Sequence, residues 1–462
     1  MLTYEDLVAA GKTDKERIEF VKKAITEHMN SPEYRKAVEA QAYYDGENPT
    51  IMRYEKILYD MQGRAHVDMW SANHKISSQF FSTVVNQEVA YLLGNGIRFN
   101  GNSTKKKLGK LFDARVLKSE LNARIHGVSF GFWNYDHLEC FSFLEFMPLL
   151  GEENGAVMSG IRHWQLADDK PLRATLYELD GYTELMQRHG EEMVILKEKQ
   201  PYKTTTKGTK AEGMEIVNGS NYEGFPIVPL YSNDQHKSAI CGKRNTIDAL
   251  DIVSSDMVNN VDEGNLIYWV LTNCGGMDDL DDAKFIERIK TTHVAHADGD
   301  AGATAEAHSV EAPIDGTIAT ADKLESRLYK DFQAFNPESV TAGNQSATAI
   351  HACYIPLDLK CDIVIEPQVT EFISGILALA GIDDEPTYQR NQIINAMEET
   401  QKIVMQAQFL PEEYITEKLL TINGDIDMID SVNEQIDAEG LGRVNNPPDD
   451  EEKTPDDGSE VS

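Results

Sequence analysis

Basic residues are scarce in this chain. Its 462 residues include 43 Lys and Arg against 77 Asp and Glu, which gives a formal net charge of −34. Affinity for nucleic acid comes from Lys and Arg that neutralise phosphates, and docking on anionic lipid needs the same charges. The composition therefore argues against a conventional DNA-binding protein and against a protein that binds anionic membranes.

The sequence also lacks paired cysteines and long apolar runs. Its five cysteines form no C-x-x-C pair, a pattern typical of free thiols in the cytosol; they are Cys140, Cys241, Cys274, Cys353 and Cys361. No run approaches the ~18 consecutive apolar residues of a membrane helix, and the first residues do not resemble a signal peptide. We therefore expect a soluble cytoplasmic protein without a membrane span.

A convincing catalytic constellation is absent too. Residues 127–131, GVSFG, match the G-x-S-x-G pattern, but a helical stretch precedes Ser129 and a strand-like one follows, whereas a hydrolase needs the reverse order. The GKT at 11–13 has Asp6 where a phosphate-binding loop needs glycine. We predict that the protein is not an enzyme and has no cofactor, with a serine hydrolase using Ser129 as the alternative.

Two further patterns have simple explanations. His293 and His296, with Asp298 and Asp300, could ligate a metal, but strand residues three apart point to opposite faces, so a solvated loop is favoured. The basic run KKKLGK at 105–110 is the best candidate for phosphate contact, although a charge run is usually a wet surface. We predict no metal site.

Apolar periodicity predicts mostly helical structure in the first hundred residues. A helix is expected over 14–45 after Thr13 as N-cap, and another over 75–99 with Gly94 near its C-terminal end. Short alternating runs broken by Gly, Asn and Asp then predict an antiparallel β-rich region from Ile125 to about Tyr231.

The rest of the chain is expected to be helical again, apart from a small insert. Helical structure is predicted through residue 381, interrupted or bounded by Pro356 and Pro367, and over 386–440. The final segment, NNPPDDEEKTPDDGSEVS, is acidic and rich in proline, which is typical of disorder.

Two amphipathic helices flank that insert, over about 246–264 and 318–336. The first has an apolar side and a polar side, and the polar side gathers Asp248, Asp251, Ser255, Asn259 and Asp262. Taken alone, this side is most simply a solvated face. The insert opens with LIYWVLTN at 266–273, a β-type run that would be a hazardous free edge in a monomer.

Several stretches, in this order along the chain, resemble the portal proteins of long-tailed bacteriophages. They are YYDGENP at 43–49, KISSQFFSTVVNQEVAYLLGNGIRF at 75–99, HGVSFGFWNYD with the MPLL and SGIRHW that follow it at 126–164, YEGFPIVPLYSND at 222–234, the helix at 246–264, and GNQSATAI at 343–350. The last departs from the family pattern, because Ala347 replaces a glycine. The resemblance covers roughly residues 15–435.

The resemblance implies an α+β portal fold that closes into a ring of about twelve subunits through head-to-tail contacts. It implies the following parts: 1–245 a wing of helices and β-rich structure, 246–264 and 318–336 the stem, 265–317 a small α/β clip, 337–382 a tunnel loop and a kinked helix, 383–442 a helical crown, and 443–462 the disordered acidic tail. The ring would sit at one capsid vertex, as the channel for DNA packaging, retention and ejection.

The resemblance also gives the polar side of the first stem helix a role. Carboxylates in a channel would keep DNA from sticking, whereas lysines would grip it. The predicted channel-lining residues are Asp248, Asp251, Ser255, Asn259 and Asp262, with Ser339, Val340, Thr341, Asn344 and Gln345 in a tunnel loop that has no Lys or Arg. The predicted contacts between neighbouring clips are Leu266, Ile267, Tyr268, Trp269, Val270 and Leu271.

The implied partners are those of a virion component. They are further copies of this chain, the terminase motor, a head–tail adaptor protein, the major capsid and scaffolding proteins, and double-stranded DNA that passes through the channel, without a membrane. Assembly would take place in the host cytoplasm. A second alternative is an acidic virion structural protein that is not the DNA channel.

Overall fold

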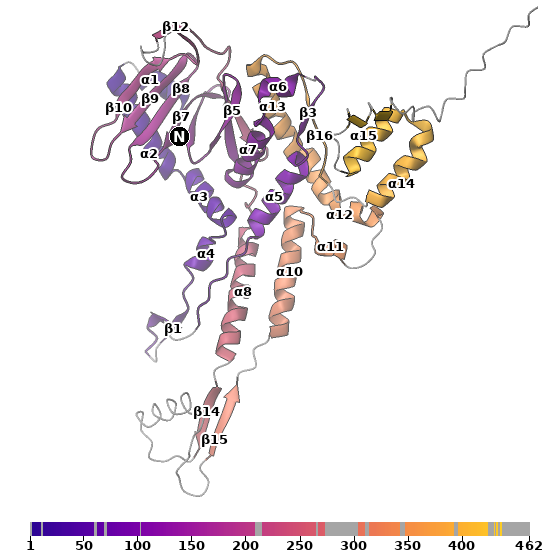
Figure 1. The fold of residues 1–462 in the computed structure, drawn as a ribbon. Coiled ribbons are helices and arrows are strands. Elements are labelled where there is room, and N and C mark those ends of the chain that lie inside the picture. The colour runs from indigo at the N-terminus through magenta and orange to yellow at the C-terminus, as the bar shows by residue number, and fades with distance from the viewer. Residues whose placement is uncertain are drawn as a thin grey trace, which may run out of the picture. The chain divides into compact units, whose positions relative to one another are not determined.

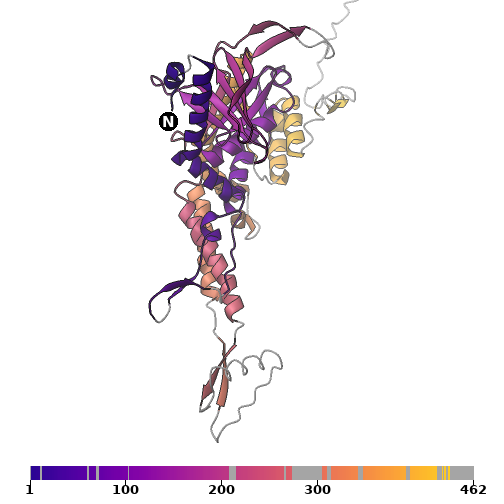
Figure 2. The same ribbon diagram turned by 90° about the vertical axis from the view of Figure 1, so that its left-hand side faces the viewer.

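A computed structural model describes the chain except residues 1, 11–12, 60–61, 69–71, 102, 208–214, 265–266, 273–303, 310–313, 342–346, 392–395, 424–428, 430, 433–434 and 437–462 (Figures 1 and 2). The chain divides into two compact units. The first comprises Met1–Asn336 and Ile355–Asn391, and the second comprises Pro337–Tyr354 and Gln392–Ser462. The expected disordered tail, 443–462, lies outside the described residues.

The chain begins with four helices, α1 (Tyr4–Ala10), α2 (Asp14–Asn30), α3 (Pro32–Tyr44) and α4 (Pro49–Met52). Thr13 caps α2 as predicted, in a capping box with Glu16. The single helix expected over 14–45 is wrong in one respect, because the chain is extended at Ser31 and starts a new helix at Pro32. Proline fits the first turn of a helix but not its interior.

The helix predicted over 75–99 is shorter than expected. Helix α5 spans Phe80–Leu93 and ends at Gly94 as predicted, whereas residues 72–79 precede it without helical structure. Ile76, expected on the apolar helix face, is 37% exposed. After α5 come β3 (Ile97–Phe99), α6 (Thr104–Leu108) and α7 (Phe112–His126).

The predicted antiparallel β-rich region is confirmed and forms two main sheets. One has five strands in the order β10-β9-β8-β7-β6, and the other has three in the order β13-β4-β5. Their bounds are β4 Val128–Asn134, β5 His137–Ser142, β6 Phe146–Leu150, β7 Val157–Trp164, β8 Leu172–Glu178, β9 Gly181–Gln187, β10 Val194–Gln200 and β13 Ile227–Tyr231. A separate hairpin pairs β11 (Lys203–Lys207) with β12 (Glu215–Ser220).

Two apolar clusters hold these elements together. In the first, Val21 and Ile25 of α2 pack with Leu149, Ile161 and Leu176 on one side of the five-stranded sheet. In the second, aromatic rings from both sheets pack together, namely Phe130, Phe132, Phe141, Phe146 and Tyr177. Full burial of one such side chain contributes about 1.5–3 kcal/mol, so these clusters fix the frame on which the remaining helices rest.

Helices α8 (Arg244–Gly264) and α10 (Ile314–Phe332) lie side by side and antiparallel (Figures 1 and 2). The strands β14 (Ile267–Thr272) and β15 (Thr304–Ser309) pair antiparallel between them in sequence. The helix expected over 318–336 both begins and ends earlier. It ends because Gln333 is left-handed with φ of 54°, and the amides of Gln333 and Ala334 donate back to Lys330 and Tyr329.

A long helical segment begins at Ala347 and ends at Ala380. Helix α12 (Ala347–Lys360) continues through a π-helical turn, Cys361–Ile365, into α13 (Glu366–Ala380). Pro356 lies within α12, and Pro367 lies in the first turn of α13. The wide π turn comes just before Pro367, whose ring would clash with the carbonyl four residues earlier in a regular helix.

The part of this segment from Ala349 to Ala380 is long and apolar enough to cross a membrane, by length and composition alone. One such helix is weak support for a span, because core helices have the same properties. Phe372, Ile373 and Ile376 are fully buried, and α13 packs on β13 and β4. These contacts are those of a core helix.

The expectation of continuous helix over 386–440 is wrong at its start. Residues Pro386–Tyr388 form β16, which pairs antiparallel with β3 and belongs to the first unit. The second unit contains α11 (Glu338–Thr341), α14 (Ala396–Gln406) and α15 (Glu412–Asn423), of which α14 and α15 pack together.

Candidate functional site

The polar side of α8 is covered by the extended segment 72–78 of the same chain. Asn259 Oδ1 accepts a hydrogen bond from the His74 amide at 2.7 Å, Ser255 Oγ from the Ile76 amide at 2.9 Å, and Asp251 Oδ1 from the Ser78 amide at 3.1 Å. Four residues of helix rise about 6 Å, and two residues of extended chain rise about 6.6 Å. The two spacings match, so each helical turn presents one acceptor to every second amide.

The N-terminal end of the same polar side forms hydrogen bonds with residues of α3 and α4 and with Asn48, the N-cap of α4. Asp248 Oδ1 accepts a hydrogen bond from the Tyr43 hydroxyl at 2.6 Å, and Asn48 Nδ2 donates to Asp251 Oδ2 at 2.7 Å. Burial, with a further contribution from Asp248, raises the pKa of Tyr43 to about 12, and burial raises the pKa of Asp251. The Tyr43 hydroxyl and the Asp251 carboxyl group thus form hydrogen bonds within the folded subunit.

These contacts correct the predicted channel lining. Asp251, Ser255 and Asn259 are 1%, 7% and 2% exposed, so they face segment 72–78 and not an open channel. Asp248 is also largely covered, with 13% of its side chain exposed. Asp262 alone among the five keeps an open side chain, 59% exposed, and it pairs with His74 at 2.8 Å.

The apolar side of α8 packs as the sequence pattern predicts. Ile247 and Leu250 are buried on α8, Leu328 and Phe332 are buried on α10, and the two helices are in contact. At the opposite end of the pair the apolar residues are open to solvent. There Val261, Ile314 and Ile318 are 47%, 41% and 43% exposed.

A buried ionic cluster lies at the end of α10 where Phe332 ends the helix. Glu88 of α5 has no exposed side-chain surface and accepts hydrogen bonds from Arg124 of α7 and Lys360 of α12. Lys360 Nζ also donates to the carbonyl of Phe332 at 2.7 Å, and Arg124 Nη1 donates to the carbonyl of Ser232 at 2.8 Å. The cluster therefore ties α5, α7, α10 and α12 to the segment after β13.

Burial and neighbouring charges shift the pKa values of the groups in and beside this cluster. Burial opposes the charge of Glu88, but Arg124 and Lys360 outweigh it and hold the Glu88 pKa below its usual value. Burial lowers the pKa of Lys360 to about 8. Burial also raises the pKa of the nearby Glu120 to about 8, and its Oε2 has no hydrogen-bond partner among the described residues.

The hydrolase alternative is wrong. Ser129 lies inside strand β4, pairs with Ser142 of β5, and is fully buried. Its Oγ donates a hydrogen bond to the carbonyl of Ser119 at 2.7 Å. A nucleophilic serine needs an exposed position at a strand-to-helix turn, and this serine is part of the core instead.

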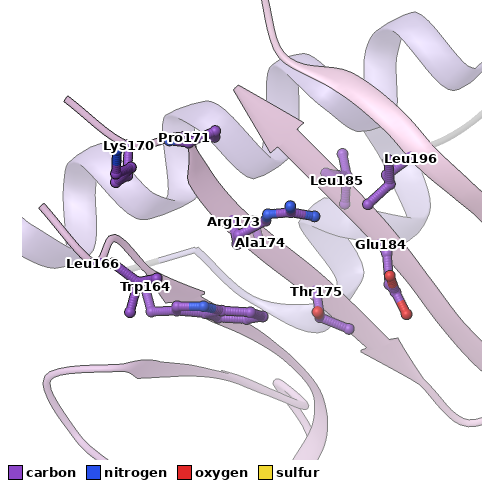
Figure 3. Close-up of a pocket in the computed structure, with 10 residues that line it drawn as sticks. All are labelled: Trp164, Leu166, Lys170, Pro171, Arg173, Ala174, Thr175, Glu184, Leu185 and Leu196. Atoms are coloured by element: carbon purple, nitrogen blue, oxygen red, sulfur yellow. The ribbon is translucent and has the colours of Figure 1, made fainter. Parts of the chain in front are cut away.

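Several cavities lie in the first unit, among them two that combine apolar side chains with polar or charged ones. One, of about 370 Å³, lies on the five-stranded sheet, where Trp164, Arg173 and Glu184 from three adjacent strands line it together with aliphatic side chains (Figure 3). The other, of about 490 Å³, is lined by aromatic and aliphatic side chains with His28 and His126. Burial lowers the pKa of His126 to about 4, so it is neutral at physiological pH.

The remaining predicted site residues are spread over several elements. Of the tunnel residues, Ser339, Val340 and Thr341 lie on the short helix α11 where a loop was expected, and Asn344 and Gln345 lie outside the described residues. Of the clip residues, those from Ile267 to Leu271 lie on β14, and Leu266 lies outside the described residues, as do His293, His296, Asp298 and Asp300. In the basic run, Lys105 on α6 pairs with Asp113 at 2.8 Å.

Comparisons of the sequence with known proteins find phage portal proteins. The family model described as phage portal protein, SPP1 Gp6-like, matches residues 23–134 and 182–440. The portal protein of Bacillus phage SPP1 is 23% identical over 74% of this chain and 68% of its own length. That of Clostridium phage phiCD119 is 20% identical over 82% of this chain and 87% of its own.

A solved structure is also similar. A chain in the neck of a native GTA particle, computed with C12 symmetry, is 10% identical with a TM-score of 0.41, over 84% of this chain and 93% of that one. The family model by itself spans well over half of the sequence. This chain therefore belongs to the SPP1 Gp6-like family of phage portal proteins.

Proposed function

We propose that copies of this chain close into a ring at one vertex of a tailed-phage capsid, and that the ring is the channel for DNA packaging, retention and ejection. The match to the portal family over most of the chain carries this proposal. Head-to-tail contacts between identical subunits close a ring when the rotation between neighbours closes, at about twelve subunits here. The ring would be a passive structure, with the energy supplied by a separate terminase motor.

We assign the parts of the ring as follows. Residues 1–245 form the wing, α8 and α10 form a stem that runs along the channel axis, and 265–317 form the clip. Residues 337–382 form the tunnel loop and the helix that follows it, and 383–442 form the crown. Neighbouring clips would meet along β14, whose only strand partner among the described residues is β15. The head–tail adaptor, capsid and scaffolding proteins would bind the outer surfaces.

The surface that faces DNA must differ from the stripe expected on α8. Three members of that stripe are covered by segment 72–78, and Asp248 is largely covered by α3 and α4. We therefore retain Asp262, Ser339, Val340 and Thr341 of α11, and Asn344 and Gln345. A wall with few cations would let DNA slide, because each retained lysine or arginine would add affinity for phosphate. The net charge of −34 supports such a wall.

The ionic cluster gives the tunnel loop a fixed base. Lys360, after the loop, donates to the carbonyl of Phe332, before it, and also pairs with the buried Glu88. The two flanks of the loop are thus held at one point of the first unit. We propose that the loop moves relative to this point while DNA passes.

The location of the chain in the virion tests the proposal directly. An antibody-gold label on this chain should mark a single vertex of each capsid, and capsids assembled without the chain should contain no DNA. Label spread over many vertices, or DNA-filled capsids without the chain, would instead favour an acidic virion protein that is not the channel.

A further inference from the structure

The hairpin of β1 (Ile57–Tyr59) and β2 (Ala65–Val67) exposes an apolar face. Ile57, Tyr59 and Val67 are 56%, 71% and 41% exposed. Ile57 and Tyr59 are two residues apart and Ile57 lies opposite Val67, so all three share one side of the hairpin. An isolated two-stranded hairpin is marginally stable in water, and a partner is expected to cover this face.

The hairpin lies at the level of the solvent-exposed end of the stem. Between α4 and α5 the chain forms the hairpin and then returns along α8, where His74 contacts Asn259 and Ser78 contacts Asp251. This direction places the hairpin beside the C-terminal end of α8. Figure 1 shows it at that level, and Figure 2 shows it extending away from the helix pair of its own chain.

The same end of the stem carries an uncovered apolar strip. It consists of Val261 on α8 with Ile314 and Ile318 on α10, and the two isoleucines are four residues apart on one face of the helix. Cyclic symmetry relates neighbours by rotation alone, so a feature meets features at its own height along the axis. In a ring with the stem along the axis, the hairpin is therefore level with this strip of the next subunit.

We propose that β1 and β2 form an arm that packs on the strip of Val261, Ile314 and Ile318 of the neighbouring subunit. The inference rests on the proposed ring. The arm would join adjacent stems through side chains that the isolated chain leaves in water, and it would cover two apolar surfaces with one contact. A second copy of the chain is the occupant because it alone presents the strip at the required height in every subunit.

Disulfide crosslinking tests the contact without disturbing the fold. In a background with Cys241→Ser and Cys274→Ser, rings that carry Tyr59→Cys are paired in turn with Val261→Cys, Ile314→Cys and Ile318→Cys, oxidised, and run on a denaturing gel without reductant. At least one pair should give a ladder of covalent multimers, and the single variants should remain monomers. Leu166→Cys, at a position 87% exposed, replaces Tyr59→Cys as the matched control.

The outcomes separate the arm from the ring. Intact rings by electron microscopy without crosslinks above the Leu166→Cys control would overturn the arm and leave the proposed function standing. Absence of rings in the unmodified protein would overturn both. As a second readout, Ile57→Ser with Tyr59→Ser should raise the concentration needed for ring assembly at least about tenfold, which Leu166→Ser should not do. Unchanged assembly of that double variant would also contradict the arm.

Discussion

Glu88, Arg124 and Lys360 are charged residues in positions where charge is costly. An ion pair without solvent offers little net stability, but loss of one partner leaves an uncompensated buried charge that costs about 3–5 kcal/mol. The three residues come from α5, α7 and α12, and Lys360 is 272 positions from Glu88 in the sequence. No local pattern relates them, so the sequence could not predict this cluster.

Glu120 offers a test of the electrostatics at this cluster. Burial raises its pKa to about 8, with Arg124 opposing the shift and Glu88 adding to it. Between its ordinary pKa and 8 the unfolded chain is ionised while the folded chain keeps the proton, so the free energy of unfolding falls as the pH rises. The loss is complete only above pH 8, and it is absent below the ordinary pKa.

Glu120→Gln should remove this dependence. Relative to the unmodified protein, the variant should gain up to about 1.4 kcal/mol per pH unit between pH 5 and 7. Urea unfolding of both proteins at the two pH values measures the difference, in which other titrating groups largely cancel. A difference that stays constant would mean that Glu120 is ionised in the folded state.

At the scale of elements, the three hydrogen bonds from the amides of segment 72–78 to the polar side of α8 form a ladder. The sequence predicted the polar side of α8 but not the segment that covers it. The polar side of α8 follows from 100° per residue, but the structure places it against segment 72–78 of the same chain. The segment that covers this side could not be predicted, because residues 75–78 were included in the helix expected over 75–99. The apolar residues of α5 recur regularly at helical spacing, so the pattern did not indicate that the helix starts only at Phe80.

Asp251→Ala should loosen that segment. Its carboxylate accepts from the Ser78 amide and from Asn48, and loss of a buried acceptor leaves these donors unpaired at about 1–3 kcal/mol. The amide of Ser78, and to a smaller degree that of Ile76, should exchange hydrogen at least about tenfold faster by mass spectrometry. Asp322→Ala, which removes an exposed charge from α10, is the matched control. Equal protection in both variants would contradict the ladder.

Other elements show which sequence signals were reliable. Capping at Thr13, termination at Gly94 and the alternation of the sheet region are local, and the structure confirms them. The break at Pro32 and the strand β16 were missed. The break at Pro32 was missed because apolar residues recur at helical spacing on both sides of it. Strand β16 was missed because it depends on pairing with β3, some 290 residues earlier.

At the scale of the whole molecule, the order of weak matches was more informative than any one of them. It identified the family, which the family model then confirmed over residues 23–134 and 182–440. It could not assign the channel surface, because a ring's lining depends on which side chains the folded subunit leaves open. Asp251 and Asn259 had the right chemistry for a channel and yet lie inside the subunit.

Electron microscopy of the purified, full-length chain tests the central claim most directly. We predict closed rings with a mass near twelve times that of the 51.7 kDa chain, with α8 and α10 of each subunit around an axial hole wide enough for duplex DNA. Monomers under all conditions, an oligomer without a central hole, or a map in which the two helices are enclosed in a globule would contradict it.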